Sequence, residues 1–487
     1  MRASRSATMA FGLLILAGAC LEPARATMTQ ICNWNADQVM MMPVVMDFHS
    51  PPSGTSQIAF ISFHNNSAHS GGVLRIIDDQ CAQVAQFPDP NCTVPIPPSC
   101  PAGLNLAVNP HLEPSSGLAA GRLDNATTDV DIVGVLDTNK QIIDFTLVNG
   151  CLRPKWCSQV LGPGNLIGGT SAPAIAQLDN PNLPQAQQNE IVIDNKVFNF
   201  NGSLRYGGAA PRSRTAIVTT RLPSSTLPVV ITGRGLYRSS SPNVWTGSLA
   251  WQNASVTSSA LVYPAVAELD ATSPGPEIVV TDTLATRLRV LSSAGAQLAS
   301  AALPNPGASN CGGPPMIGNI GFPVIGVASC TRYTLYRYSP GVLTQLWTQP
   351  ISDPSGQTTS TFYVTPIGNL IYYGDAFNLR IFNAANGAVL QTLPNTSATA
   401  LEGPVIASLK AAQPLSRVIV AATDYQGGGG QRGIRIFSDP WLGVTRGTWN
   451  QHTYHLTNVT SSSGNIPVLE VPNWINANHN TYRVQWP

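Results

Sequence analysis

The stretch Tyr263–Gly295, YPAVAELDATSPGPEIVVTDTLATRLRVLSSAG, contains three short apolar runs separated by turn residues. The runs are Pro264–Leu269, Glu277–Val280 and Leu288–Leu291, and the turn Ser292–Gly295 follows the third. β-Branched side chains favour a pleated, half-buried backbone, and clusters of Pro, Gly and Ser end such segments. The stretch therefore predicts three short strands. A unit of this size cannot bury its own faces, so its strands need further copies to pack against.

The same order of segments recurs along the chain. Ser171–Asp179 (SAPAIAQLD) precedes Glu190–Ile193 (EIVI) and Val197–Gly202 (VFNFNG), for example. Alignment on the position of Pro264 gives the anchors Pro43, Leu118, Pro173, Ile217, Pro264, Pro315, Pro366 and Pro404. A period of roughly 40–50 residues with several strands per repeat is typical of a β-propeller. We therefore predict an all-β propeller of about eight blades, or seven if the copy at Thr215–Leu222 merges with its neighbour.

The last repeat lacks a strand for a closed ring. The segment from Pro404 to Asp439 offers three clear strands, whereas a ring must close to remove its sheet edges. We expect the missing strand to come either from residues 27–41 or from the C-terminal tail. The propeller is predicted to occupy residues 27–440, and residues 441–487 are predicted to form a cap that docks on it.

These repeats resemble the FG-GAP blades, also called VCBS repeats, of integrin-α-type propellers. The resemblance lies in an apolar run around a proline that ends in Leu-Asp, a Glu-Ile-Val-Val run, and a third apolar strand before Asn-Gly or Ala-Gly. It covers about Pro43 to Asp439. Members of that family often carry a calcium loop of the type Asp-x-Asp-x-Asp-Gly between the first two strands. The loops after Asp179 and Asp270 depart from this pattern, since each keeps only the first acid and a distant glutamate.

One loop keeps more of the calcium pattern that the resemblance implies. It contains three acids, Asp124, Asp129 and Asp131. Calcium takes six to eight oxygen ligands, mostly from closely spaced carboxylates and carbonyls. These three residues are therefore the candidate calcium ligands, and no other cofactor is predicted. The aspartates of the other loops are expected to accept backbone N–H groups in tight turns.

The N-terminal residues 1–26 have the pattern of a signal peptide. A start with two arginines precedes the apolar run Met9–Ala19, which is too short to span a bilayer. The sequence ARA then offers a cleavage site between Ala26 and Thr27. We expect a secreted or cell-surface protein. The alternative is a lipoprotein anchored at Cys20.

Composition restricts the partners of an exported chain. Charged residues make up only 10% of the sequence, against about 25% in typical domains, and the formal net charge is +1. This balance argues against nucleic acid and against an electrostatically bound membrane surface. No other apolar run is long enough to cross a membrane, so no transmembrane segment is predicted. The expected partner is an extracellular ligand, either a protein or a glycan.

Eight of the nine cysteines remain once Cys20 is removed with the signal. An even number in an exported chain predicts disulfides, although many pairings are possible. Proximity in the sequence favours the pairs Cys92–Cys100, Cys151–Cys157 and Cys311–Cys330, which leaves Cys32–Cys81. No C-x-x-C spacing occurs, which argues against a zinc ribbon or a thioredoxin-type redox site.

The tail is dense in Trp, His, Asn and Tyr. It resembles a C-terminal module of large bacterial surface and secreted proteins, and the residues that carry the resemblance are Trp449, His452, Tyr454, His455 and Trp474. The two histidines could share a metal only on a helix or turn, because positions i and i+3 face opposite sides of a strand. We expect instead that these rings pack the tail onto the propeller, with Thr481–Gln485 extended against it.

The sequence contains no nucleophile elbow G-x-S-x-G and no Walker phosphate loop. We therefore predict an exported, non-catalytic binding or adhesion protein that presents loops on one propeller face. The alternative is a secreted or periplasmic enzyme on the same scaffold, either a quinoprotein-like dehydrogenase or a polysaccharide lyase. The dehydrogenase alternative depends on Phe382–Leu390, which is similar to the repeat of quinoprotein dehydrogenases. Gln391, however, stands where that repeat has tryptophan.

Overall fold

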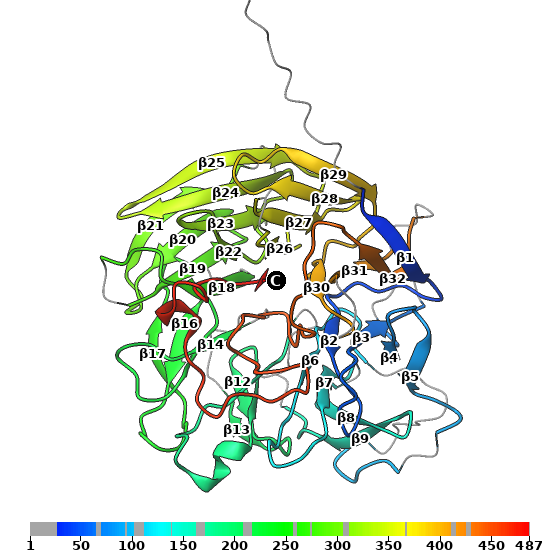
Figure 1. Ribbon diagram of the computed structural model, residues 1–487. Helices are drawn as coiled ribbons and strands as arrows, with labels where there is room; N and C mark the ends of the chain where they lie inside the picture. Colours follow the sequence, from blue (N-terminus) through cyan, green and yellow to red (C-terminus); the bar gives the residue numbers. More distant parts are fainter. Residues whose placement is uncertain are drawn as a thin grey trace, which may run out of the picture.

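The computed structural model (Figure 1) describes residues 27–486 except 65–69, 93–94, 102–111, 138, 162–170, 208–216, 257–260, 273–274, 305–310, 366–367, 411–414 and 425–429. The expected signal peptide, with Cys20 and Ala26, and the anchor Pro366 lie outside the described residues. Only two short 3-10 helices occur in the described part, η1 (Pro184–Gln187) and η2 (Asn473–Ile475). No helix in that part is long and apolar enough to cross a membrane.

The described strands form eight small sheets around a central axis, an eight-bladed β-propeller (Figure 1). Blade 1 comprises β2 (Val44–Met46), β3 (Gln57–Ser62), β4 (Val73–Ile77) and β5 (Gln83–Phe87), and blade 2 comprises β6 (Ala119–Gly121), β7 (Asp131–Val135), β8 (Ile142–Val148) and β9 (Cys151–Cys157). Blade 3 comprises β10 (Ala174–Ala176), β11 (Glu190–Ile193), β12 (Lys196–Phe198) and β13 (Leu204–Tyr206), and blade 4 comprises β14 (Val218–Thr220), β15 (Val229–Ile231), β16 (Gly235–Arg238) and β17 (Ser248–Gln252). The eight-blade prediction is thus confirmed, and the Thr215–Leu222 copy forms part of a blade of its own.

The remaining blades follow the same order. Blade 5 comprises β18 (Val262–Ala267), β19 (Glu277–Asp282), β20 (Arg287–Leu291) and β21 (Gln297–Ala302), and blade 6 comprises β22 (Met316–Asn319), β23 (Pro323–Ala328), β24 (Arg332–Ser339) and β25 (Val342–Pro350). Blade 7 comprises β26 (Ser360–Tyr363), β27 (Leu370–Gly374), β28 (Asn378–Asn383) and β29 (Val389–Pro394), with β33 (Val484–Gln485) beside β26. Blade 8 comprises β30 (Val405–Ala407), β31 (Arg417–Ala422), β32 (Gly433–Ser438) and β1 (Thr29–Trp34).

Burial falls from the axis outward, and the sequence follows it. Every residue of β19, with the sequence EIVVTD, is buried, as is every residue of the inner strand β18. The outer strand β25 is largely exposed. A continuous apolar run is expected where neighbouring blades cover both faces of a strand, and a mixed run where one face meets solvent. This gradient explains why the second strand of each repeat carries the clearest sequence signal.

Neighbouring blades are joined by aromatic rings that rest on glycines. The glycines lie in the turn before the outer strand of the next blade, and the pairs are Trp156 with Gly202, Trp251 with Gly295 and Trp347 with Gly387. Each of these glycines has a positive φ, between 73° and 88°. A Cβ at Gly387 would lie 2.6 Å from the Trp347 ring, so a larger residue fits neither the backbone nor the space. The Asn-Gly turn of Phe382–Leu390 therefore has a packing role between blades 6 and 7.

The N-terminal strand closes the ring. β1 pairs antiparallel with β32 and supplies the outer strand of blade 8, which is the first of the two alternatives raised by the sequence. A disulfide between Cys32 and Cys81 then ties β1 to the turn after β4 in blade 1. The first and last blades are consequently joined by both strand pairing and a covalent bond.

The sequence prediction was wrong about the inner strand of blade 7. The alignment placed the first strand of this blade at the anchor Pro366, whereas the structure places that strand at β26 and begins the second strand, β27, at Leu370. Thr365 instead belongs to a turn, in which its hydroxyl and backbone carbonyl bond with Gly368. The proline-based alignment failed here because β26, STFY, has no proline to mark it.

Two of the four expected disulfides were also wrong. The structure pairs Cys92 with Cys151 and Cys100 with Cys157, instead of Cys92–Cys100 and Cys151–Cys157, whereas Cys32–Cys81 and Cys311–Cys330 are as expected. Cys151 and Cys157 are the first and last residues of β9. Six residues of strand span about 20 Å, far beyond the roughly 6 Å between Cα atoms of a disulfide. The two bonds therefore fasten the long insertion after β5 to the outer strand of blade 2.

One end of the axis is closed by apolar side chains. Met40 and Met41, which precede the inner strand of blade 1, pack in one cluster with Tyr263 of blade 5 and Leu401, which precedes blade 8. These residues lie at or before the starts of the inner strands. Strands from distant blades are thus packed together across the axis at this end. The other end is covered by the C-terminal tail.

Candidate functional site

The tail, residues 441–486, contacts the inner strands of the blades in succession around the axis (Figure 1). Its first contacts, in blades 8, 1, 2 and 3, join Thr445 to Ser408, Trp449 to Val45, Gln451 to Ala119 and Gln451 to Ile175. Later contacts, in blades 5, 6 and 7, join Asn473 to Val266, Asn480 to Glu268, Tyr482 to Ile317 and Val484 to Phe362. The final residues are extended, and β33 adds a short parallel strand to β26. The tail is therefore bonded to seven of the eight blades.

Most residues of the C-terminal module that the sequence singled out are buried in this arrangement. Trp449 and Tyr454 are 0% exposed, and their rings stack with centroids 4.5 Å apart. Trp474 is half-buried beside blade 4, where it lines a hollow of about 330 Å³ together with Leu222 and Pro223. These aromatic rings therefore have packing contacts with the propeller.

The two histidines of the module have different partners. His452 Nδ1 accepts a hydrogen bond of 3.2 Å from buried Arg483, and burial and that guanidinium hold the His452 pKa well below its usual range. His455 lies between the Thr453 carbonyl oxygen at 3.2 Å and Glu470 Oε1 at 2.6 Å. The structure thus does not bring the two imidazoles to a common ligand.

The candidate calcium ligands also have other partners. Asp131 is buried, with Oδ1 2.6 Å from Lys155 Nζ and Oδ2 accepting the Leu123 N–H at 2.7 Å. Asp129 accepts a hydrogen bond of 2.6 Å from a serine hydroxyl, and Asp124 accepts a backbone N–H within its own turn. No group of three or more His, Cys, Asp or Glu side chains in the described part of the chain is placed to hold a metal ion.

The acid at the start of the second strand has a recurring structural role. Asp131, Glu190 and Glu277 each accept the backbone N–H of a leucine in the preceding loop, at 2.7 to 2.8 Å. Gln57 does the same in blade 1 for Phe48, at 2.8 Å. Burial raises the pKa of Glu190 to about 8 and that of Glu277 to about 7. The distant glutamate of the repeat pattern therefore secures the loop between the first two strands.

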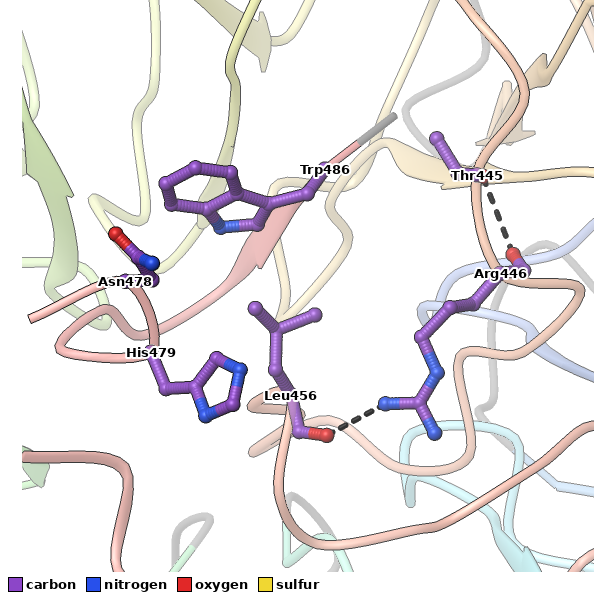
Figure 2. A pocket seen from close by; sticks show the side chains of 6 residues that line it. All are labelled: Thr445, Arg446, Leu456, Asn478, His479 and Trp486. Carbon is purple, nitrogen blue, oxygen red and sulfur yellow. Dashed lines mark hydrogen bonds between the residues drawn. The ribbon is translucent and has the colours of Figure 1, made fainter. Parts of the chain in front are cut away.

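A pocket of about 580 Å³ opens among residues of the tail (Figure 2). Its lining consists of Thr445, Arg446, Leu456, Asn478, His479 and Trp486. Figure 2 shows the Trp486 ring, Leu456 and His479 on one side of the space and the Arg446 side chain on the other. None of the residues predicted from the module pattern is among them. Sequence reasoning missed the pocket because its lining comes from separated positions of an irregular segment.

Local hydrogen bonds fix the polar side of the pocket. Asn476 organises a turn in which its side chain accepts the Asn478 N–H at 2.9 Å and its carbonyl accepts the His479 N–H at 2.8 Å. Asn480 anchors the end of this turn to Glu268 of blade 5 through two hydrogen bonds, at 2.6 and 2.7 Å. The Asn478 and His479 side chains are consequently presented from a braced turn.

The opposite wall is set by an arginine. Arg446 donates hydrogen bonds of 2.5 Å to the carbonyl oxygens of Leu456 and Val459. Trp486 follows β33 directly and packs in part against the core of blades 6 and 7. Its indole Nε1 is buried without a hydrogen-bond partner among the described residues. The pocket thus combines an aromatic ring, an imidazole, an amide and a guanidinium.

The comparisons with known proteins support the fold. No protein-family model and no curated protein sequence matches the chain. Among solved structures, the biofilm matrix protein Bap1 of V. cholerae is similar with a TM-score of 0.73 and 14% identity, over 94% of this chain and 98% of Bap1. The rhamnogalacturonan lyase YesW has a TM-score of 0.53 and 10% identity, over 86% of this chain and 76% of YesW. The exotype lyase YesX has a TM-score of 0.51 and 12% identity, over 83% of this chain and 72% of YesX.

Proposed function

We propose that this protein is an exported, non-catalytic binding or adhesion protein that holds an extracellular ligand in the tail pocket. The observation that carries the proposal is the convergence of Trp486, Arg446, Asn478 and His479 on one space. A hollow of several hundred Å³ with an apolar wall and a few convergent polar groups is typical of small-ligand sites. The braced turn and the disulfide-linked propeller would hold these groups in place with little movement.

Two further observations support an extracellular role. Four disulfides persist most readily in an oxidising compartment. The fold is shared with Bap1, which is a biofilm matrix protein. The non-catalytic part of the proposal is supported by the six lining residues, which include one imidazole and no carboxylate. A pair of groups for general acid and general base chemistry is therefore not present in that lining.

Replacing Trp486 tests the binding site. In a screen of glycans and proteins against the mature chain, we expect Trp486→Ala to weaken binding of any ligand found by at least roughly tenfold, because a large flat contact surface is lost. Phe377→Ala is a matched control, since that ring is 59% exposed in the turn between β27 and β28. Titration calorimetry of both variants would measure the change. Equal affinity of Trp486→Ala and wild type would contradict the proposed site.

We also propose that the blades are FG-GAP or VCBS-type repeats whose loop acids act as hydrogen-bond acceptors in place of calcium ligands. The Asp131 contacts to Lys155 and Leu123 support this proposal. Chelation with EDTA should then shift the melting temperature by less than about 2 °C, because an ion that does not bind the native state cannot stabilise it. A large shift that disappears in the Asp124→Asn, Asp131→Asn double variant would show a calcium site.

A further inference from the structure

The tail pocket carries a positive charge that no carboxylate among the described residues neutralises. The Arg446 guanidinium bonds to two carbonyl oxygens, and no carboxylate of the described residues lies within ion-pair distance of it. Glu470, an acid of the same segment, is engaged by His455 at 2.6 Å and by the Thr457 hydroxyl at 2.8 Å. Carbonyl acceptors satisfy N–H groups without cancelling the charge. The pocket is therefore suited to a ligand that supplies the anion.

The apolar wall of the pocket has the shape of a stacking surface. The Trp486 ring forms one side of the pocket, and Leu456 lies next to it (Figure 2). The inner part of Trp486 packs against the core that contains Met316 and Phe362, which restricts its movement. A flat indole in a fixed position can lie against the C–H face of a sugar ring. A pyranose offers an apolar face of this kind, and its hydroxyl groups remain free for the polar side chains of the pocket.

The turn beside Trp486 adds planar hydrogen-bonding groups. The side chains of Asn478 and His479 make no hydrogen bond within the described part of the protein, and their backbone is fixed through Asn476. An amide and an imidazole can each donate and accept, as the hydroxyl groups of a saccharide require. Together with Arg446, they surround the ring of Trp486 with both charge and hydrogen-bonding capacity.

We propose that the pocket binds an acidic saccharide, with a uronate carboxylate at Arg446 and the sugar ring against Trp486. Hydroxyl groups of the same sugar bond to Asn478 and His479. This inference rests on the proposed binding function and specifies its ligand class. A guanidinium is well matched to carboxylate because its N–H groups form a planar fork.

An acidic peptide would use different features of the protein. Extended peptides bind sheets by adding a strand to a free edge. The inner edge of β26 is already paired with β33, and Tyr482 occupies the edge of β22 at Ile317. Recognition at this pocket must therefore come from side chains, which favours a saccharide.

The test compares one saccharide with and without its charge. Titration calorimetry of the mature chain should show that trigalacturonate binds at least about tenfold more tightly than its fully methyl-esterified form, because charge-assisted hydrogen bonds are the stronger ones. Arg446→Gln should reduce this ratio to near one, and Arg446→Lys should restore part of it. This ratio of the two affinities distinguishes a loss of carboxylate recognition from structural damage, since a distorted pocket would lose affinity for both ligands together. His479→Gln should weaken both ligands and leave most of the ratio.

The outcomes separate this inference from the proposed function. Trp486-dependent binding of neutral sugars only would overturn the acidic-saccharide assignment and leave the binding function intact. Preference for an oligo-aspartate peptide over trigalacturonate would overturn the assignment in favour of an acidic peptide. If no saccharide and no peptide bound in a Trp486-dependent way, both proposals would fail. Appearance of the ultraviolet absorbance of an unsaturated uronate would show cleavage by elimination and overturn the non-catalytic part.

Discussion

A chain that ends at Asp439 should lose cooperative thermal unfolding, or melt far below the full-length protein. The tail places seven large apolar side chains in the interior, namely Leu442, Trp449, Tyr454, Val459, Ile466, Tyr482 and Val484. At about 1.5–3 kcal/mol for each buried side chain, their removal costs on the order of 10 kcal/mol. That is comparable with the whole stability of a typical domain, about 5–15 kcal/mol.

The position of these side chains strengthens the expectation. Trp449 and Tyr454 belong to the core shared by blades 1, 2, 3 and 8, Tyr482 to that of blades 4, 5 and 6, and Val484 to that of blades 6 and 7. Leu442 belongs to the core of blades 7 and 8, so deletion of the tail would expose parts of four cores at once. β1 would still close the ring, so the loss would come from the axis and not from the blade 8 seam.

Circular dichroism during heating measures the melting temperature of the truncated chain. A single substitution in the tail tests how much one of these buried side chains contributes. Trp449→Ala should cost about 3–5 kcal/mol, because the ring is fully buried and its cavity cannot collapse easily. Ile475→Ala is the matched control from the same tail, since Ile475 is 55% exposed. A truncated protein with the melting temperature of the full-length chain would show that the tail is a detachable appendage.

The repeats were predictable from sequence because each blade carries its own signal. Strands buried on both faces appear as runs such as EIVV, and three glycines in turns before outer strands, Gly202, Gly295 and Gly387, are required by a tryptophan ring of the preceding blade. The prediction of two disulfide pairs failed for the opposite reason. Cys151 and Cys157 are close in sequence but lie at the two ends of one extended strand, so their true partners come from the insertion. Proximity along the chain is informative only where the backbone turns.

The candidate site was less accessible to sequence reasoning. Trp449 and Trp486 are both tryptophans of one polar segment, yet the first is a core residue and the second lines the pocket. Their difference depends on how the tail circles the axis, which no short motif encodes. The glutamates of the repeat loops present a similar ambiguity. The sequence position of Glu277 fits a remote calcium ligand as well as a loop acceptor, and only the structure shows that it accepts the Leu269 N–H.

Stability should fall as the pH rises above about 6.5, and Glu402 should account for much of the fall. Glu402 is buried between blades 7 and 8, where Oε1 accepts the Ala398 N–H at 3.0 Å and Oε2 has no partner among the described residues. Burial raises its pKa from 4.5 to about 8. Because the folded state favours the protonated acid, this stability is fully present below pH 4.5 and is lost as the pH rises through 8. Burial raises the pKa of Asp353 to about 6 and that of Glu190 to about 8, in the same direction.

His452 limits the window in which this effect can be measured. Its pKa in the folded protein is lowered by burial and by Arg483, so its contribution is present above pH 6.5 and is lost as the pH falls. Below pH 6.5 this contribution offsets that of one buried carboxyl group, whereas between about pH 6.5 and 8 the carboxyl groups act without that opposition. Over that interval the ionisation of one carboxyl group lowers the free energy of unfolding by about 2 kcal/mol, at roughly 1.4 kcal/mol per pH unit.

Glu402→Gln removes the ionisation and should flatten the profile of unfolding free energy against pH by about that amount. Urea unfolding at several pH values measures the slope, with half-exposed Asp270→Asn as the control. Parallel profiles for Glu402→Gln and wild type would mean that Glu402 is already ionised in the folded protein, in which case its unpartnered oxygen must be reached by water.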